Sequence, residues 1–187
     1  MPSWVQSLKT LQKKIPDDWL AVYQEFIAEK NDRGAALIAA AQVENVLRRL
    51  LEVALVDLTP DEWSALFERD APFSSFSKLI RVTYAFGLID KEFRQSLDRI
   101  REIRNTFAHA ASIVTFETEE IANACSLLSC VVESLGGVDL PASHPKVKYI
   151  GACFQVLGIL ALAGTEDERS KDWTAPLKWS YGASLDK

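Results

Sequence analysis

Side chains that can handle a phosphate group lie together in the segment from Arg99 to Ser112, which reads RIREIRNTFAHAAS. This segment contains Arg104, Asn105 and His109. An arginine can hold a phosphate through paired hydrogen bonds, and a histidine can transfer a proton near neutral pH. The same residues could instead only hold one helix within a bundle. The sequence narrows this choice and leaves both interpretations open.

The segment is predicted to lie on a helix from Asp90 to about Ala110. At about 100° per residue, the side chains of this helix divide into two arcs. The apolar arc, which is expected to face the core, contains Phe93, Leu97, Ile100, Ile103 and Phe107. A polar stripe contains Arg94, Arg101, Asn105 and His109, with Asp98 close to it. Arg104 is the exception, because it falls within the apolar arc.

Arg104 is therefore predicted to be buried and to need an acceptor, since an unpaired buried charge costs about 3–5 kcal/mol. Glu44 is the expected partner, because it is a carboxylate within AAAQVENVLRR, the most apolar long helical segment. This interpretation makes Glu44 and Arg104 a structural ion pair. Removing either side chain alone should then strongly destabilise the fold.

Arg101, Asn105 and His109 form the second predicted feature, a polar ledge along one face of the helix. Their spacing of four residues brings them to the same side, where they could bind a phosphate or a carboxylate. The simpler alternative for His109 is an ordinary histidine at the end of a helix, a position that the helix dipole favours. Both alternatives remain open.

The rest of the chain has helical and not strand periodicity, which predicts a single all-α domain over residues 1–187. The expected architecture is a helical bundle of about seven to eight helices with short connections. Its predicted helices cover Trp4–Lys13, a segment that begins at Asp17 or Asp18 and ends near Glu29, a long segment from Asn31, Thr59–Arg69, a segment that begins at Ser74 or Ser75 and ends near Phe86, Asp90–Ala110, a segment from Ile121 to the pair Gly136–Gly137, and Lys146–Gly164. Residues 165–187 are expected to form a tail on the surface.

Composition limits the classes of function. The net charge of −5 argues against general nucleic-acid binding, which needs an excess of Lys and Arg. The three cysteines have no CxxC spacing, and His144 has no ligand at metal-binding spacing, so neither a metal nor another cofactor is expected.

Tyr149–Ala163 is too short for a membrane span, which favours a buried core helix. We expect a cytoplasmic protein with no membrane contact.

The spacing from Arg104 to His109, with Asn105 directly after the arginine, resembles the R-x4-H motif of the HEPN superfamily. Active members of that superfamily are metal-independent endoribonucleases. The resemblance implies that Arg104 would steady the scissile phosphate and that His109 would help move the proton of the attacking 2′-hydroxyl. It adds Asn105 to the catalytic set, and it implies a cleft shared by two subunits.

A closer resemblance is to the mannitol operon repressor (MtlR-like) family within that superfamily. DRGAALIAAAQVENVLRRLL is similar to its first core helix, and the block from Pro72 to His109 is similar to its most recognisable part. VTFETEEIANAC and HPKVKYIGACFQVLGILAL continue the similarity, which covers about residues 31–163. The resemblance implies a regulator without a standard DNA-reading module. Direct DNA binding is therefore not expected without a partner.

Two functions remain as expectations. The first is a non-enzymatic transcriptional regulator or interaction module, which acts through a protein partner or as a homodimer. Gly151 and Gly158, seven residues apart on an apolar helix, would permit a second copy to approach closely. The alternative is a HEPN-type endoribonuclease that cleaves RNA. Whether the chain is an enzyme therefore stays open, and the non-enzymatic function is the one expected first. An enzyme should expose Arg104 and His109 in one electropositive groove, whereas an interaction module should hold Arg104 against a carboxylate.

Overall fold

A computed structural model describes residues 18–68, 70–130 and 140–163 of the chain. Within these ranges the protein is all-α, which confirms the predicted fold class. The helices are α2 (Trp19–Ala28), α3 (Asp32–Ala54), α4 (Pro60–Phe67), α5 (Phe76–Ala85), α6 (Lys91–His109), α7 (Glu119–Ser126) and α8 (Pro145–Ala163). The predicted helix Trp4–Lys13 and the predicted tail 165–187 lie outside the described residues.

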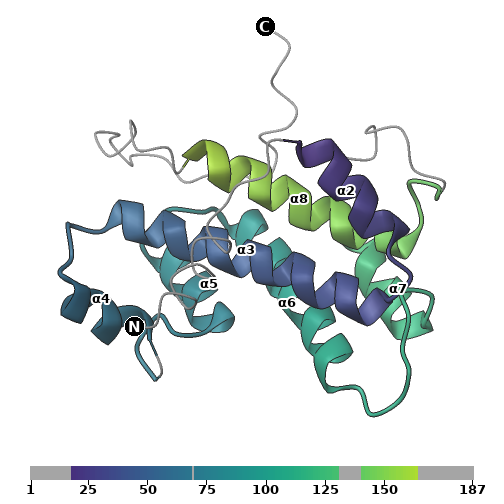
Figure 1. Ribbon diagram of the computed structural model, residues 1–187, viewed down its shortest axis with the longest axis horizontal. Helices are drawn as coiled ribbons and strands as arrows, with labels where there is room; N and C mark the ends of the chain where they lie inside the picture. Colours follow the sequence, from purple (N-terminus) through teal and green to yellow (C-terminus); the bar gives the residue numbers. More distant parts are fainter. Residues whose placement is uncertain (1–17, 69, 131–139, 164–187) are drawn as a thin grey trace, which may run out of the picture.

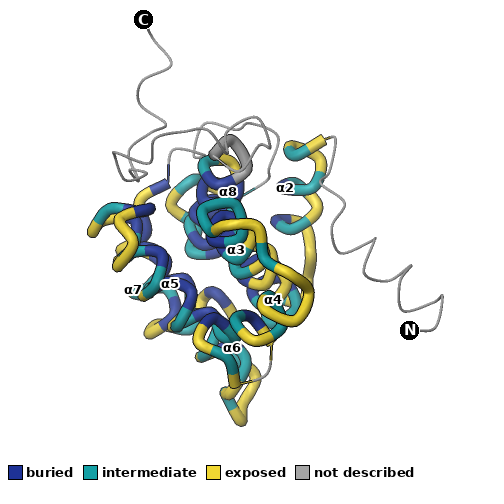
Figure 2. The backbone as a smooth tube through the Cα atoms, turned by 90° about the vertical axis from the view of Figure 1, so that its left-hand side faces the viewer, coloured by how far each residue is buried: buried dark blue, intermediate teal, exposed yellow. Residues whose placement is uncertain are grey.

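Helix α3 occupies the centre of the bundle (Figure 1). It packs against α8, α6 and α5, while α2 lies against α8 and α7 packs against both α6 and α8. Figure 2 shows that α8 is buried along most of its described length, whereas α4 lies at the periphery with an exposed outer side. The strongly apolar sequence of α8 is explained by this position, because neighbouring helices surround it.

Most helix starts follow the capping chemistry expected from the sequence. The side chains of Asp18, Asn31 and Asp90 accept hydrogen bonds from the first-turn amides of α2, α3 and α6, respectively. Thr59 and Glu62 form the predicted reciprocal capping box at the start of α4. Ser75, one of the two predicted caps, directly precedes α5, but its side chain makes no capping hydrogen bond.

Two helix ends show how local signals succeed and fail. Gly87 ends the α5 region with φ of +71°, a left-handed conformation that favours glycine, as the sequence predicted. In contrast, α7 ends at Ser126, although the apolar sequence predicted a helix continuing towards Gly136. Leu128 and Cys130 are buried without belonging to a helix, so these two apolar residues reflect core packing and not helical structure. Residues 131–139 lie outside the described ranges.

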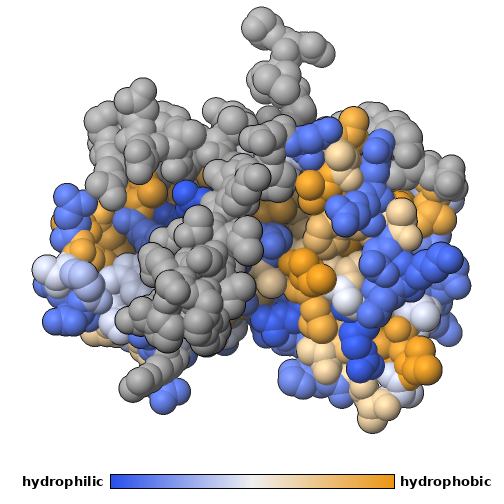
Figure 3. Space-filling view, viewed as in Figure 1, coloured by the Kyte–Doolittle hydropathy of each residue, from blue (hydrophilic) through white to orange (hydrophobic). Residues whose placement is uncertain are grey.

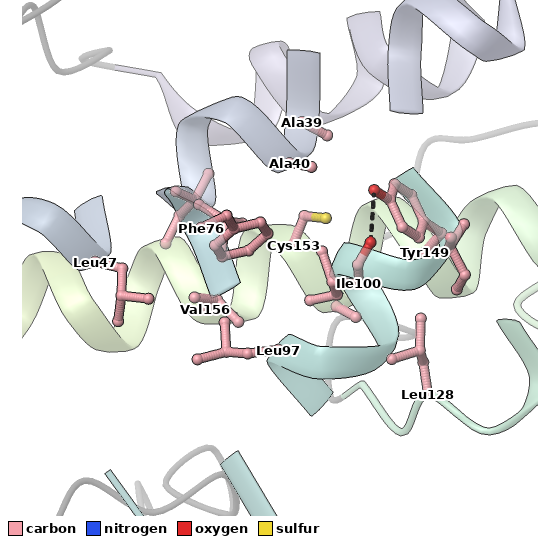
Figure 4. Close-up of a cluster of buried hydrophobic side chains, with 14 of the residues drawn as sticks. Ala39, Ala40, Leu47, Phe76, Leu97, Ile100, Leu128, Tyr149, Cys153 and Val156 are labelled. Carbon is pink, nitrogen blue, oxygen red and sulfur yellow. Dashed lines mark hydrogen bonds between the residues drawn. The ribbon is translucent and has the colours of Figure 1, made fainter. Parts of the chain in front are cut away.

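The core joins α3, α6 and α8 at one point (Figure 4). Ala39 and Ala40 present small side chains from α3, which lets α8 lie close with Tyr149 and Cys153 facing inward. The buried hydroxyl of Tyr149 lies 3.2 Å from the Ala36 carbonyl oxygen and 3.4 Å from the Ile100 carbonyl oxygen, and either oxygen can accept its hydrogen bond. Burial raises the pKa of Tyr149 well above its ordinary value, so the hydroxyl stays protonated and can donate.

The predicted apolar arc of α6 faces this core. Phe93, Leu97, Ile100, Ile103 and Phe107 are all buried, as the helical periodicity predicted. The ring of Phe107 packs against Phe116, with the ring centroids 4.8 Å apart, and Phe116 packs in turn against Tyr149. Helix α6 is thereby held with one fixed side inward, and its polar stripe must point away from the core.

Helix α8 corrects one expectation from the sequence. Gly151 is buried within the single chain, so it offers no outer surface for the approach of a second copy. Gly158 is exposed, and a Cβ atom there would meet nothing within 4 Å. Across the described ranges, no helix has both the length and the apolar character that crossing a membrane would require.

Candidate functional site

The Arg104 side chain turns toward α3. Its Nη2 atom lies 3.3 Å from Oε2 of Glu44, the partner expected from the sequence, and its Nη1 atom donates to Oδ1 of Asn105 at 3.0 Å. The guanidinium also lies over the ring of Phe76, 5.9 Å from the ring centroid. Arg104, Asn105 and Glu44 thus form one connected group at the boundary between α3 and α6.

This ion pair is less buried than the sequence predicted. The Arg104 side chain remains 27% exposed and that of Glu44 21% exposed. The predicted partner is found, but the prediction that Arg104 is buried was wrong, because the two long side chains meet at the boundary between α3 and α6, where water still touches both. Water screens such a pair, so its removal should cost less than the loss of a fully buried pair.

The polar ledge of Arg101, Asn105 and His109 is divided between different contacts. The Nε atom of Arg101 lies 3.8 Å from Oδ1 of Asp98, and its Nη2 atom contacts the carboxylate of Glu102. Asn105 uses its carbonyl oxygen to accept from Arg104. His109 is exposed in the last turn of α6. The arginine charge on the ledge is therefore already balanced by carboxylates of its own helix.

A second connection between α3 and α6 was not predicted. Nη2 of Arg33, at the start of α3, donates to the carbonyl oxygens of Ala110 and Ser112 at 2.9 and 3.0 Å. This contact fixes the chain directly after His109. The sequence offered no signal for it, because NDRG indicated only the beginning of a helix and the two ends of the contact are 77 residues apart.

Asp32 completes this arrangement from the preceding position. Its Oδ2 atom accepts from the Phe116 amide at 3.0 Å, and its Oδ1 atom lies 3.2 Å from Nζ of Lys146. The Lys146 side chain is only 6% exposed and also donates to the Glu29 carbonyl oxygen. The loop after α6 is therefore attached to both α3 and α8 through charged groups.

Two hollows flank the end of α6. The first has a volume of about 380 Å³ and lies between Lys30–Arg33 and Ala111–Thr115. The second, of about 250 Å³, lies between α6 and α7, with Ile103, Ile121 and Leu127 among its lining residues. Neither hollow is lined by Arg104, Asn105 or His109. Where the described residues are visible in Figure 3, hydrophobic patches lie among hydrophilic side chains.

Nucleophilic and metal chemistry have little support in the described ranges. All three cysteines are buried and none forms a disulfide, and burial raises the pKa of Cys125 to about 12, which keeps its thiol protonated at neutral pH. No group of three or more His, Cys, Asp or Glu side chains there is placed to hold a metal ion. His144 accepts from the Lys146 amide through Nδ1 and has its Nε2 atom 3.8 Å from Oε1 of Glu117, so it connects the start of α8 with the segment before α7.

The α4–α5 pair is the only place in the described residues where two short consecutive helices could resemble a DNA-binding helix-turn-helix, and Lys78 of α5 is bound within the chain. The Lys78 ammonium donates to the Ala71 carbonyl oxygen and to the Ser74 hydroxyl, both in the segment that precedes α5. Comparison with protein-family models, with curated proteins and with solved structures found no match. The assignment of a function therefore depends on the geometry of the residues described above.

Proposed function

We propose that this chain is a non-enzymatic interaction module, similar to the MtlR-like regulators it resembles, and that it acts by binding a protein partner. The observation that supports this most directly is the contact of Arg104 with Glu44 and Asn105. Two of the guanidinium nitrogens that would hold a phosphate already bind acceptors within the chain.

The charge of Arg104 strengthens this argument. Arginine stays protonated in proteins, so its affinity for an RNA phosphate depends on whether another anion already balances its charge. Glu44 supplies that anion at 3.3 Å. To bind RNA, Arg104 would have to leave Glu44 with an unpaired and mostly buried carboxylate. A metal-independent nuclease would therefore lose part of its binding energy before any chemistry began.

The ledge of α6 supports a role in binding rather than catalysis. Asp98 and Glu102 balance the charges of Arg94 and Arg101, whereas His109 is exposed and available to a partner at the end of the helix. A neutral, hydrogen-bonding surface of this kind suits contact with another folded protein. The partner can be a different protein or a second copy of the chain.

One observation favours the alternative function, a HEPN-type endoribonuclease. Arg104 keeps 27% of its side chain exposed, and His109 is exposed five residues later on the same helix. Both side chains therefore reach water, which full burial of Arg104 would have prevented. If the Glu44 contact opened on binding RNA, the two residues could approach one phosphate.

The deciding experiment is incubation of the purified chain with mixed single-stranded RNA in the presence of a metal chelator. The expected result is intact RNA for the unmodified chain. Cleavage that leaves 2′,3′-cyclic phosphate ends, and that disappears in both Arg104→Ala and His109→Ala, would overturn the proposal. Arg99→Ala is the matched control, because it removes an arginine from another side of α6, and circular dichroism must show that every variant remains folded.

A further inference from the structure

We propose that the hollow between the start of α3 and the loop after α6 is a docking site for an acidic peptide segment of a partner protein that carries one large apolar side chain. The site lies beyond the C-terminal end of α6 and is not lined by Arg104, Asn105 or His109. The proposal therefore does not depend on whether α6 cleaves RNA or binds a partner through its ledge.

The charge at this hollow is opposite in sign to that of the whole chain. Lys30 and Arg33 both line it, and Arg33 gives its Nη2 hydrogen bonds to two neutral carbonyl oxygens. Asp32 also lines the hollow, but its carboxylate lies against the ammonium of Lys146. Among the residues that line the hollow, the two cations Lys30 and Arg33 therefore stand against the single carboxylate of Asp32, although the chain carries a net charge of −5. An acidic ligand is favoured here by local charge.

An exposed apolar side chain, Ile113, lines the hollow on the side of the loop after α6. Ile113 is 95% exposed and lines the hollow together with Ala111 and Val114. Among the exposed large apolar side chains of the described residues, Ile113 is the most exposed. A partner that covers Ile113 would remove this apolar surface from water, which is the general driving force of protein association. The occupant should therefore present an apolar side chain next to its carboxylates.

The loop that carries Ile113 is held in place before any partner arrives. Arg33 binds the carbonyl oxygens of Ala110 and Ser112, and Asp32 binds the amide of Phe116. The Thr115 amide donates to the Thr118 hydroxyl at 3.0 Å, which closes the following turn. Because these contacts span Ile113 on both sides, binding requires little further ordering of the loop. The hollow of about 380 Å³ has a volume ordinary for a ligand site.

The hollow between α6 and α7 provides an internal contrast. Its lining includes three carboxylates and one cation. The carboxylates belong to Asp98, Glu102 and Glu120, and the cation is Arg99. An acidic segment would meet mostly like charge there. The charge of the two hollows therefore directs an acidic partner to the one at Ile113.

The test is fluorescence anisotropy with a labelled short peptide that has a central phenylalanine flanked by aspartate and glutamate. Two control peptides replace the acidic residues by lysine, or the phenylalanine by serine. The acidic peptide with phenylalanine should bind at least about tenfold more tightly than either control, because charge and apolar burial both contribute. Raising the salt concentration should weaken its binding.

Variants of the full chain locate the binding. Ile113→Ser and Lys30→Glu should each weaken binding of the acidic peptide by about fivefold or more. The first removes the apolar contact and the second removes a positive charge. Lys91→Glu, which makes the same charge change at the opposite end of α6, should leave the affinity unchanged. Three results would overturn the proposal: no binding of the acidic peptide, equal binding of the lysine peptide, or equal loss of affinity in Lys91→Glu and Lys30→Glu. Because Ile113 and Lys30 are exposed, all variants are expected to keep the native melting temperature.

Discussion

Arg104 and Arg33 both connect α3 with the region of α6, but they bind different kinds of acceptor. Arg104 reaches from α6 to the Glu44 carboxylate, so its charge is balanced. Arg33 reaches from α3 to two carbonyl oxygens after α6, so its hydrogen bonds are satisfied while its positive charge remains. The difference teaches that hydrogen bonding and charge balance are separate properties of a site. A well-bonded arginine can still attract an anionic partner.

The ion pair next to Arg33, formed by Asp32 and Lys146, is more buried than the pair formed by Arg104 and Glu44. Lys146 has a side chain that is 6% exposed, and Asp32 is its carboxylate partner. At the Arg104 position both partners keep contact with water. The two regions should therefore respond differently to the loss of a carboxylate, and this comparison can be tested by measuring the free energy of unfolding.

The largest effect is expected for Asp32→Ala. It leaves the buried Lys146 ammonium without its carboxylate and the Phe116 amide without its acceptor, so the chain should lose about 3–5 kcal/mol of stability. Urea denaturation measures this loss. Adding Lys146→Met should recover part of it, because the unpaired charge is then also removed. A loss of stability no greater than that caused by Asp61→Ala, which removes an exposed acid in α4, would show that the buried pair is not the more important of the two.

A smaller effect is expected for Glu44→Ala and for Arg104→Ala. Because water reaches both side chains, each change should cost about 1–3 kcal/mol, which lies between the values for exposed and for buried pairs. A double-mutant cycle measured by urea denaturation should show coupling between the two positions. Purely additive losses would mean that the 3.3 Å contact contributes nothing to stability.

Arg33→Gln should destabilise the chain by about 1 kcal/mol, because it weakens hydrogen bonds to two carbonyl oxygens without leaving a charge unpaired. Its more specific consequence should be faster amide hydrogen exchange in the loop from Ala110 to Phe116. Hydrogen exchange read by mass spectrometry provides the measurement, with Arg49→Gln, an exposed arginine of α3, as the control. Unchanged exchange in the loop would show that Arg33 does not hold it.

The smallest effect is expected for Arg101→Ala, at about 0.5 kcal/mol, because its partners Asp98 and Glu102 lie on its own helix with side chains that are 39% and 64% exposed, and such local pairs contribute little. The measurement is the same urea denaturation. A loss as large as that of Arg104→Ala would mean that the two arginines of α6 have equivalent structural roles, which their contacts contradict.

Much of the fold follows from neighbouring residues. The start of α4 could be predicted because Thr59, Pro60 and Glu62 satisfy the first amides of a helix within one turn. The inward side of α6 could be predicted because its apolar residues recur with the helical period, and the same rotation pointed Arg104 toward α3. In each case the physical cause acts over a few residues, so the sequence contains it directly.

The candidate sites depend on contacts that no local pattern contains. The Arg33 contacts to Ala110 and Ser112, the Asp32 contact to Lys146 and the exposure of Arg104 each depend on how separate helices are placed. The sequence by itself determined an all-α chain with a polar stripe on α6. Only the tertiary structure decided which charges are balanced, because the electrostatic interaction between two side chains depends on their distance and on the water around them.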